Sequence, residues 1–194
     1  MAKLQFNRQG VIDISIKLFA QQGYTGSSMQ QIVKVTGLKP GSIYNAFGNK
    51  EGLYKEALES YSDRSIKHIR ETIEAAQSTQ LGICQVLEKA IQGTLEKNYC
   101  SCFIIKTQLE LAARGAVEGG LFEFSLQRLA QTETLYKNYL LNDFNDEQSA
   151  AKATSIMLHV FGLRVYGYQR KSVQVLRKGL MQGLPWLPWS DFYQ

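Results

Sequence analysis

Residues 27–51, SSMQQIVKVTGLKPGSIYNAFGNKE, predict two short helices separated by a glycine turn, with a third helix beginning directly after them. Ser28 and Gln31 have the spacing of a capping box, which satisfies free backbone donors at a helix start. Gly37 can end that helix, because glycine adopts the left-handed conformation without steric cost. Pro40 suits the first position of the second helix, where its missing N–H is no loss. This pattern constrains the fold more than any other feature of the chain.

The second helix of this motif is expected to begin at Pro40 and to end at Phe47. It carries Ser42, Tyr44 and Asn45 near its start. In helix-turn-helix proteins the second helix lies in the major groove and contacts base edges with its N-terminal residues. The spacing therefore favours a DNA-binding function for this end of the chain.

The excess positive charge lies at the same end. Residues 1–55 contain seven Lys or Arg and two Asp or Glu, whereas residues 56–194 contain 15 of each, so the net charge of +5 belongs to the N-terminal part. A basic end on a neutral remainder is suited to the phosphate backbone of DNA. The alternative is a solvated basic face without a partner.

With these features the segment resembles the DNA-binding domain of TetR-family transcriptional repressors over roughly residues 8–56. The matching positions are Phe19, Gly23, Tyr24, Ser28, Ile32, Gly37, residues 41–47 (GSIYNAF) and residues 49–51 (NKE). Lys39 departs from the Ser or Thr cap that is frequent in the family, and Asn45-Ala46 replaces a frequent pair of histidines. The resemblance implies a three-helix DNA-binding domain, a homodimer on a palindromic operator, and release by a small ligand.

The composition indicates a folded protein, because 44% of the 194 residues are hydrophobic and this suffices for a core. No run approaches the ~18 apolar residues of a membrane span. The first residues lack an apolar signal region, so we expect a cytoplasmic protein without a membrane partner. Three cysteines, Cys84, Cys100 and Cys102, are too few and odd in number for a disulfide scaffold.

The remainder of the chain predicts an all-α fold, with a DNA-binding domain at residues 1–50 and a helical ligand-binding and dimerisation domain at residues 51–194. Apolar residues recur at three-to-four spacing from Leu53 to Ile73, which predicts one long helix. Further helices are expected near residues 81–98, 101–114, 117–141, 146–168 and 172–183, separated by short breaks.

The last two of these helices are expected to form a dimer interface. One stripe holds Ala150, Ala153, Thr154, Met157, Phe161 and Arg164, and another holds Val173, Leu176 and Leu180. Two such faces can meet across a two-fold axis as a four-helix bundle. The alternative is that these faces close the core of a single chain. A dimer would hold two helix-turn-helix motifs about one helical turn or a multiple apart, as a near-palindrome requires.

We expect eight residues to form the DNA interface: Ser28, Lys39, Pro40, Gly41, Ser42, Tyr44, Asn45 and Lys50. Ser28 stands at a helix N-terminus that can bind phosphate. Lys39 and Lys50 would add positive charge beside the backbone, and the resemblance implies a phosphate contact for Tyr44. Ser42 and Asn45 are the candidates for base edges, since asparagine can bond adenine in a bidentate way. Alternatively, Lys39 reaches guanine and Tyr44 packs in the core, which is the place we expect for Phe47.

The neutral C-terminal part is rich in aromatic residues and is the expected site of a small-molecule effector. The candidate ligand-binding residues are Cys102, Phe103, Lys106, His159 and Tyr166. Aromatic residues at helical spacing are more often plain core, so it is the resemblance that favours a pocket. A ligand would act by favouring a conformer whose recognition helices no longer match the operator.

Cys102 precedes an apolar run that resembles the start of the sixth helix in a TetR subgroup, some members of which sense electrophiles through a cysteine here. A helix N-terminus lowers the pKa of a thiol, and Lys106 one turn further on could assist. A buried, inert cysteine is the alternative. Cys100 and Cys102 are a poor metal pair, because residues two apart on a helix face away from each other, and we expect no metal and no cofactor.

Two other classes of function stay open at this point. The sequence contains no H-E-x-x-H, no G-x-S-x-G and no phosphate-binding glycine loop, so we do not expect an enzyme. A Cys102/His159 dyad would nevertheless need only spatial closeness. The other class is a family member that has lost DNA binding and carries a ligand. The basic N-terminal end argues against that class.

Overall fold

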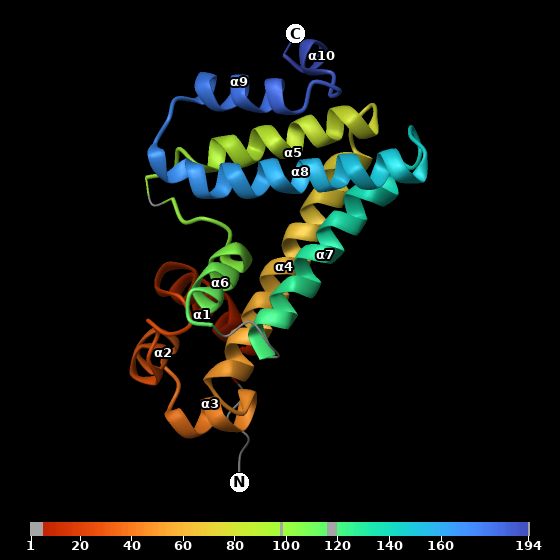
Figure 1. Cartoon of the computed structure of the whole chain (residues 1–194). Coiled ribbons are helices and arrows are strands. Elements are labelled where there is room, and N and C mark those ends of the chain that lie inside the picture. Colours follow the sequence, from red (N-terminus) through yellow and green to blue (C-terminus); the bar gives the residue numbers. More distant parts are fainter. Residues whose placement is uncertain (1–5, 98, 116–119, 194) are drawn as a thin grey trace. The chain divides into compact units, whose positions relative to one another are not determined.

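The computed structural model describes residues 6–97, 99–115 and 120–193, and every regular element within them is a helix (Figure 1). The elements are α1 (Arg8–Gln22), α2 (Met29–Thr36), α3 (Pro40–Phe47), α4 (Lys50–Glu74), α5 (Thr79–Gly93), α6 (Phe103–Ala112), α7 (Gly120–Leu140), α8 (Asp146–Tyr166), the 3₁₀ turn η1 (Gly167–Gln169), α9 (Val173–Gly183) and α10 (Trp189–Phe192). The predicted all-α class is confirmed. In these described ranges no helix is long and apolar enough to cross a membrane, and no cluster of His, Cys, Asp or Glu is placed to hold a metal ion.

Side-chain caps explain where several helices begin. Ser78 accepts a hydrogen bond from the Leu81 amide at 3.2 Å and starts α5 slightly earlier than the apolar periodicity predicts. Asn145 and Ser172 cap α8 and α9 in the same way. The other expected helices are found with boundaries shifted by a few residues, except that the expected start at residue 117 lies outside the described residues.

The chain divides into two compact units. The first unit takes in residues 1–63 and 102–128, and the second takes in residues 64–101 and 129–194. The helix-turn-helix segment therefore shares its unit with α6. This division differs from the expected domain boundary at residue 50, because a helix that is distant in sequence packs with α1.

The core of the first unit is built on buried aromatic rings. Phe19, Tyr54 and Phe103 are fully buried, and the ring centroid of Tyr54 lies 4.6 Å from that of Phe19 and 5.1 Å from that of Phe103. The Tyr54 hydroxyl lies 2.8 Å from the Thr107 hydroxyl, so its polar end has a partner inside the core. These contacts join α1, α4 and α6.

The second unit is a helical layer in which α5, α8 and α9 lie side by side (Figure 1). Its core includes Ile83, Leu87, Ile156 and Leu180, and α10 packs onto α5 through the buried ring of Trp189. A second link between α9 and α5 is polar. The hydrogen bonds from Arg177 outweigh burial and lower the pKa of Glu88 to about 2, so the pair stays ionised at neutral pH.

Candidate nucleic-acid interface

The start of α2 has the predicted capping box. The Ser28 hydroxyl accepts from the Gln31 amide at 3.2 Å, and the Gln31 side-chain oxygen accepts from the Ser28 amide at 2.7 Å. Ser28 itself is exposed. The capping box occupies the amides of Ser28 and Gln31, which leaves those of Met29 and Gln30 for a phosphate at this helix end.

The turn between α2 and α3 also follows the prediction. Gly37 has φ +70° and ψ 4°, the left-handed conformation, and its amide bonds to the Val33 carbonyl at 2.9 Å. Pro40 occupies the start of α3, and Lys39 stands before it without any side-chain cap hydrogen bond. The Lys39 side chain is exposed. Its ammonium group is therefore accessible to a partner in solution.

Helix α3 has one buried face and one exposed face. Ile43 and Phe47 are buried, with 0% and 6% of their surface exposed, whereas Tyr44 is 48% exposed. Pro40, Gly41 and Asn45 are exposed, and Ser42 is half-buried. The prediction that Phe47 packs in the core is confirmed, and the alternative that Tyr44 does so is wrong. An exposed helix of this length can enter a major groove.

The first turn of α3 leaves room for close approach. A methyl group added at Gly41 would find no heavy atom of the protein within 4 Å. The opposite end of the helix is fixed, because Arg8 donates to the Ala46 carbonyl at 2.9 Å and pairs with Glu56 on α4. The guanidinium also lies 4.3 Å from the centre of the Phe47 ring. Arg8 was missed from the sequence, because its partners lie far along the chain.

Lys50 makes contacts inside the protein, whereas we expected it to lie beside the DNA backbone. Its ammonium donates to the carbonyls of Tyr24 at 3.0 Å and Ser27 at 3.1 Å, and it lies 4.2 Å from the centre of the Tyr24 ring. These contacts hold the segment before α2 against the start of α4. A phosphate contact by Lys50 would compete with two internal hydrogen bonds, so Lys39 is the better placed of the two lysines.

Two residues of α6 hold the end of α1 in place. Lys106 donates to the Ala20 carbonyl, and the Glu110 carboxylate accepts from the amides of Tyr24 at 2.9 Å and Thr25 at 2.8 Å. A Cβ at Gly23 would lie 2.2 Å from a Glu110 oxygen, so this approach requires glycine. Burial alone would raise the pKa of Glu110, but the hydrogen bonds from Thr25 and Tyr24 hold that pKa below its usual range. We call these contacts the α6 clamp.

The residues expected to bind an effector do not form one site within either unit. Cys102, Phe103 and Lys106 belong to the first unit, and His159 and Tyr166 belong to the second. Phe103 is buried among Phe19, Tyr54 and Tyr61. Lys106 belongs to the α6 clamp. Both residues therefore have structural tasks that the sequence did not reveal.

Cys84, Cys100 and Cys102 are thiols outside any disulfide bond, and they differ in burial. Cys102 stands directly before α6 and is half-buried, as is Cys100. Cys84 is fully buried, and burial raises the pKa of its thiol to about 12. Cys84 is therefore the inert thiol, and the sensing role of Cys102 stays a prediction.

The expected dimer stripe needs correction. Ala153, Met157, Leu176 and Leu180 are buried in the core of the second unit, so they close the single chain. The exposed apolar side of α8 and α9 is made of other residues. They line a groove of about 700 Å³ and include Leu158, Gly162, Val165, Tyr166, Val175 and Gly179. His159 also lines this groove, with its Nδ1 2.7 Å from the Ser155 carbonyl oxygen.

Comparisons with known proteins agree with this geometry. Residues 11–57 match the model for bacterial regulatory proteins of the tetR family. The chain is 42% identical over 64 residues to the transcriptional repressor ComR of Escherichia coli, covering 32% of this chain and 30% of ComR. It is 25% identical over 107 residues to the regulator YezE of Bacillus subtilis, covering 55% of each protein. The matches thus span about a third to half of these relatives.

Solved structures extend the likeness of fold to nearly the whole chain. The TetR-family regulator CifR, a cysteine mutant complexed with 26-base-pair operator DNA, superposes with a TM-score of 0.79 at 21% identity, over 97% of this chain and 100% of CifR. Reduced NemR of Escherichia coli superposes with a TM-score of 0.75 at 16% identity, over 91% and 94% of the two chains. The motif, the family model and the fold agree, and residues 11–57 form a DNA-binding domain of the tetR family of bacterial regulatory proteins.

Proposed function

We propose that this protein is a transcriptional repressor that binds a palindromic operator as a homodimer. The observation that carries the proposal is the division of α3 into a buried face, with Ile43 and Phe47, and an exposed face, with Gly41, Tyr44 and Asn45. The basic charge of the N-terminal part supports the same partner, double-stranded DNA. CifR, whose fold this chain shares, was solved on operator DNA.

Within this proposal the contacts have separate tasks. The amides at the start of α2, beside Ser28, together with Lys39 and Tyr44, bind phosphate and position the protein. Asn45 and Ser42 reach base edges, while Pro40 and Gly41 keep the first turn of α3 slim enough to enter the groove. We propose these roles from the exposure and the chemistry of the residues. We also propose that the protein binds DNA in the cytoplasm.

Dimerisation is the second part of the proposal. The groove between α8 and α9 exposes Leu158 (68%), Val165 (49%) and Val175 (52%), which is apolar surface that a second copy would remove from water. Gly162 and Gly179 lie on the same surface and have no heavy atom within 4 Å of an added Cβ. Small residues permit close approach of the helices across a two-fold axis.

A small ligand, or modification of the Cys102 thiol, is proposed to release the DNA. A ligand can do so only by binding the DNA-free conformer more tightly than the DNA-bound one. The proposed activity is regulation, and no enzymatic step is assigned to the chain.

Gel retardation with the DNA around the protein's own gene tests the central claim. We expect a shifted complex whose affinity falls steeply as salt rises, because phosphate contacts release counterions. A random duplex of equal length is the control and should bind much more weakly. Equal binding to both duplexes, or no shift at moderate salt, would overturn the assignment as an operator-binding regulator.

A further inference from the structure

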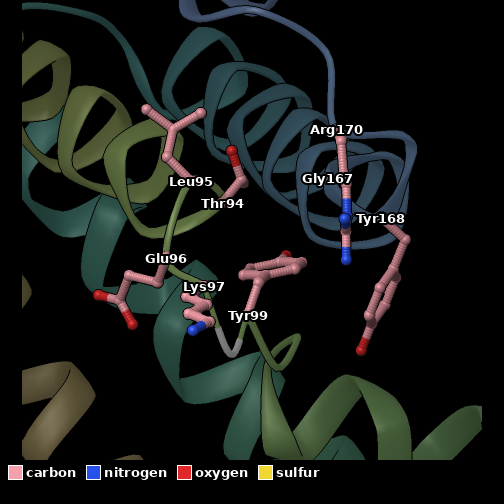
Figure 2. Close-up of a pocket in the computed structure, with 8 residues that line it drawn as sticks. All are labelled: Thr94, Leu95, Glu96, Lys97, Tyr99, Gly167, Tyr168 and Arg170. Carbon is pink, nitrogen blue, oxygen red and sulfur yellow. The ribbon is translucent and has the colours of Figure 1, made fainter.

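A cavity of about 520 Å³ lies in the second unit, between the segment that follows α5 and the turn that follows α8 (Figure 2). Its walls include Leu95, Lys97 and Tyr99 from the first segment, and Tyr168 and Arg170 from the second. Small-molecule sites typically occupy roughly 300–1,000 Å³. The size of this cavity therefore suits a small organic ligand.

Hydrogen bonds fix the aromatic walls. The Tyr99 hydroxyl donates to the Arg164 carbonyl at 2.7 Å, and the Tyr168 hydroxyl accepts from the Ser101 amide at 3.1 Å. The two ring centroids lie 5.2 Å apart. Burial raises the pKa of Tyr99, so its phenol stays protonated at neutral pH and adds no negative charge. The cavity thus offers ring surfaces that are already in place.

Close backbone packing supports the same walls. A Cβ at Gly167 would lie 2.8 Å from the Thr94 methyl carbon and 3.0 Å from the Tyr99 hydroxyl oxygen. Only glycine permits this approach of η1 to the segment after α5. The cavity is therefore a built feature of the second unit rather than a chance gap between loops.

The charge of the lining is positive. Among the described lining residues Lys97 and Arg170 are the two cations and Glu96 is the one acidic residue. Across residues 6–97, 99–115 and 120–193, none of the three has an ion-pair partner or a side-chain hydrogen bond. Figure 2 shows Tyr99 between Lys97 on one side and Arg170 with Tyr168 on the other. Two free cations flanking aromatic rings favour an anion that carries a ring.

The backbone holds Arg170 in an uncommon conformation. Its φ of 50° and ψ of 39° are left-handed, and it is the one non-glycine residue with positive φ in the described part of the chain. Its amide bonds to the Gly167 carbonyl at 3.1 Å. Such a conformation is unfavourable for a residue with a side chain and persists where the surroundings determine it. The guanidinium therefore starts from a fixed point on the cavity wall.

We propose that this cavity binds a small aromatic anion, such as an arene carboxylate, with the ring against Tyr99, Tyr168 and Leu95, the carboxylate on Arg170, and Lys97 adding positive charge to the opposite wall. The site shares no residue with the expected effector set of Cys102, Phe103, Lys106, His159 and Tyr166. The proposal concerns ligand binding by the protein alone, so it stands or falls independently of DNA binding.

Isothermal titration calorimetry of the full chain with three small ligands of similar shape tests the proposal. Benzoate, neutral benzamide and cationic benzamidine differ mainly in charge. We expect benzoate to bind, benzamide to bind about tenfold more weakly or worse, and benzamidine to give no measurable binding, because a hydrogen bond to a charged group is worth more than a neutral one. Similar affinity for all three probes, or no heat with millimolar benzoate, would overturn it.

Substitutions then locate the site. Arg170→Gln and Lys97→Gln should each lower benzoate affinity, Arg170→Gln by about tenfold, since the bidentate partner is lost. Lys171→Gln is the matched control, because Lys171 is the exposed basic neighbour of Arg170 and does not line the cavity. Thermal unfolding should be the same for all three variants. An equal loss of benzoate affinity in Lys171→Gln would place the binding elsewhere and contradict the proposal.

Discussion

Gly41 is the residue whose surroundings best separate a structural role from a role in binding. An added methyl group would touch nothing in the protein, so Gly41→Ala should not disturb packing. Alanine is favoured over glycine in a helix by roughly 0.5–1 kcal/mol, and the variant should unfold at a slightly higher temperature. Operator affinity should fall at the same time, because the methyl group would fill the space where the duplex approaches. Thermal unfolding and fluorescence anisotropy with labelled operator measure the two effects.

The control for this variant is Gly93→Ala. Gly93 ends α5 in the second unit, and the nearest atom to its added Cβ is an Arg164 nitrogen at 3.9 Å. Operator affinity should therefore stay at the wild-type value. Full affinity in Gly41→Ala would mean that the first turn of α3 does not approach the DNA closely.

Asn45 and Lys39 are both exposed but are assigned different kinds of contact. Asn45→Ala should lower the binding free-energy preference for one base at one operator position by about 1–3 kcal/mol, because a base-edge hydrogen bond is lost. Lys39→Ala should weaken binding to all operator sequences alike, and it should reduce the slope of log affinity against log salt concentration by about 1. Binding to a panel of single-base operator variants at several salt concentrations distinguishes the two. The same pattern in both variants would contradict this division.

The stabilisation that the α6 clamp provides should depend on pH, because the clamp contains the carboxylate of Glu110. The pKa of Glu110 in the folded protein lies below its usual value of 4.5. A carboxyl group whose pKa is depressed by folding stabilises the protein. This stability is fully present above the pKa of the group in the unfolded protein and is lost as pH falls through its pKa in the folded protein. Glu110→Gln should therefore lower the free energy of unfolding by about 1–2 kcal/mol at neutral pH, and the difference from wild type should shrink in acid. Denaturant unfolding at several pH values measures this.

Comparison with a second carboxylate isolates the clamp. Glu59 is exposed on α4, and Glu59→Gln removes the same charge without removing the hydrogen bonds to Tyr24 and Thr25. Its unfolding free energy should follow wild type at each pH. If Glu110→Gln kept a constant difference from wild type down to pH 3, the titration of Glu110 would not be the cause.

Local sequence predicted local structure well at the level of elements. Ser28, Gly37 and Pro40 fix the ends of α2 and α3 through neighbours within four residues, so the sequence contains all the information needed. Lys50 and Lys106 could not be placed in the same way. Their acceptors are carbonyls 23 and 86 residues away, which only the tertiary fold brings near.

The proposed dimer surface shows what hydrophobic periodicity alone cannot predict. A stripe at 3.6-residue spacing identifies an apolar face, but it does not say whether the same chain or another copy covers it. Met157 and Leu180 face the core of their own unit, whereas Leu158 and Val175, which the stripe left out, are exposed. A helix with apolar residues on two sides needs the structure to separate them.

At the scale of the whole molecule, one helix-turn-helix reads only a few base pairs, and the proposed repressor depends on a second copy. The exposed apolar residues of α8 and α9 are the surface proposed to supply it. Leu158→Glu places a charge at the most exposed of them, where dimerisation would have to bury it without a partner. In light scattering at micromolar concentration we expect this variant to be a monomer and the wild type to be a dimer.

Leu141→Glu is the matched control, because Leu141 is also an exposed leucine, at 44%, but lies beyond the end of α7 and outside the groove. It should stay dimeric. The monomeric variant should bind the full operator no better than a half-site, since the gain from linking two recognition helices is lost. Wild type should prefer the full operator strongly. A monomeric wild type, or a Leu158→Glu variant that keeps this preference, would show that the groove between α8 and α9 does not join the two copies on DNA.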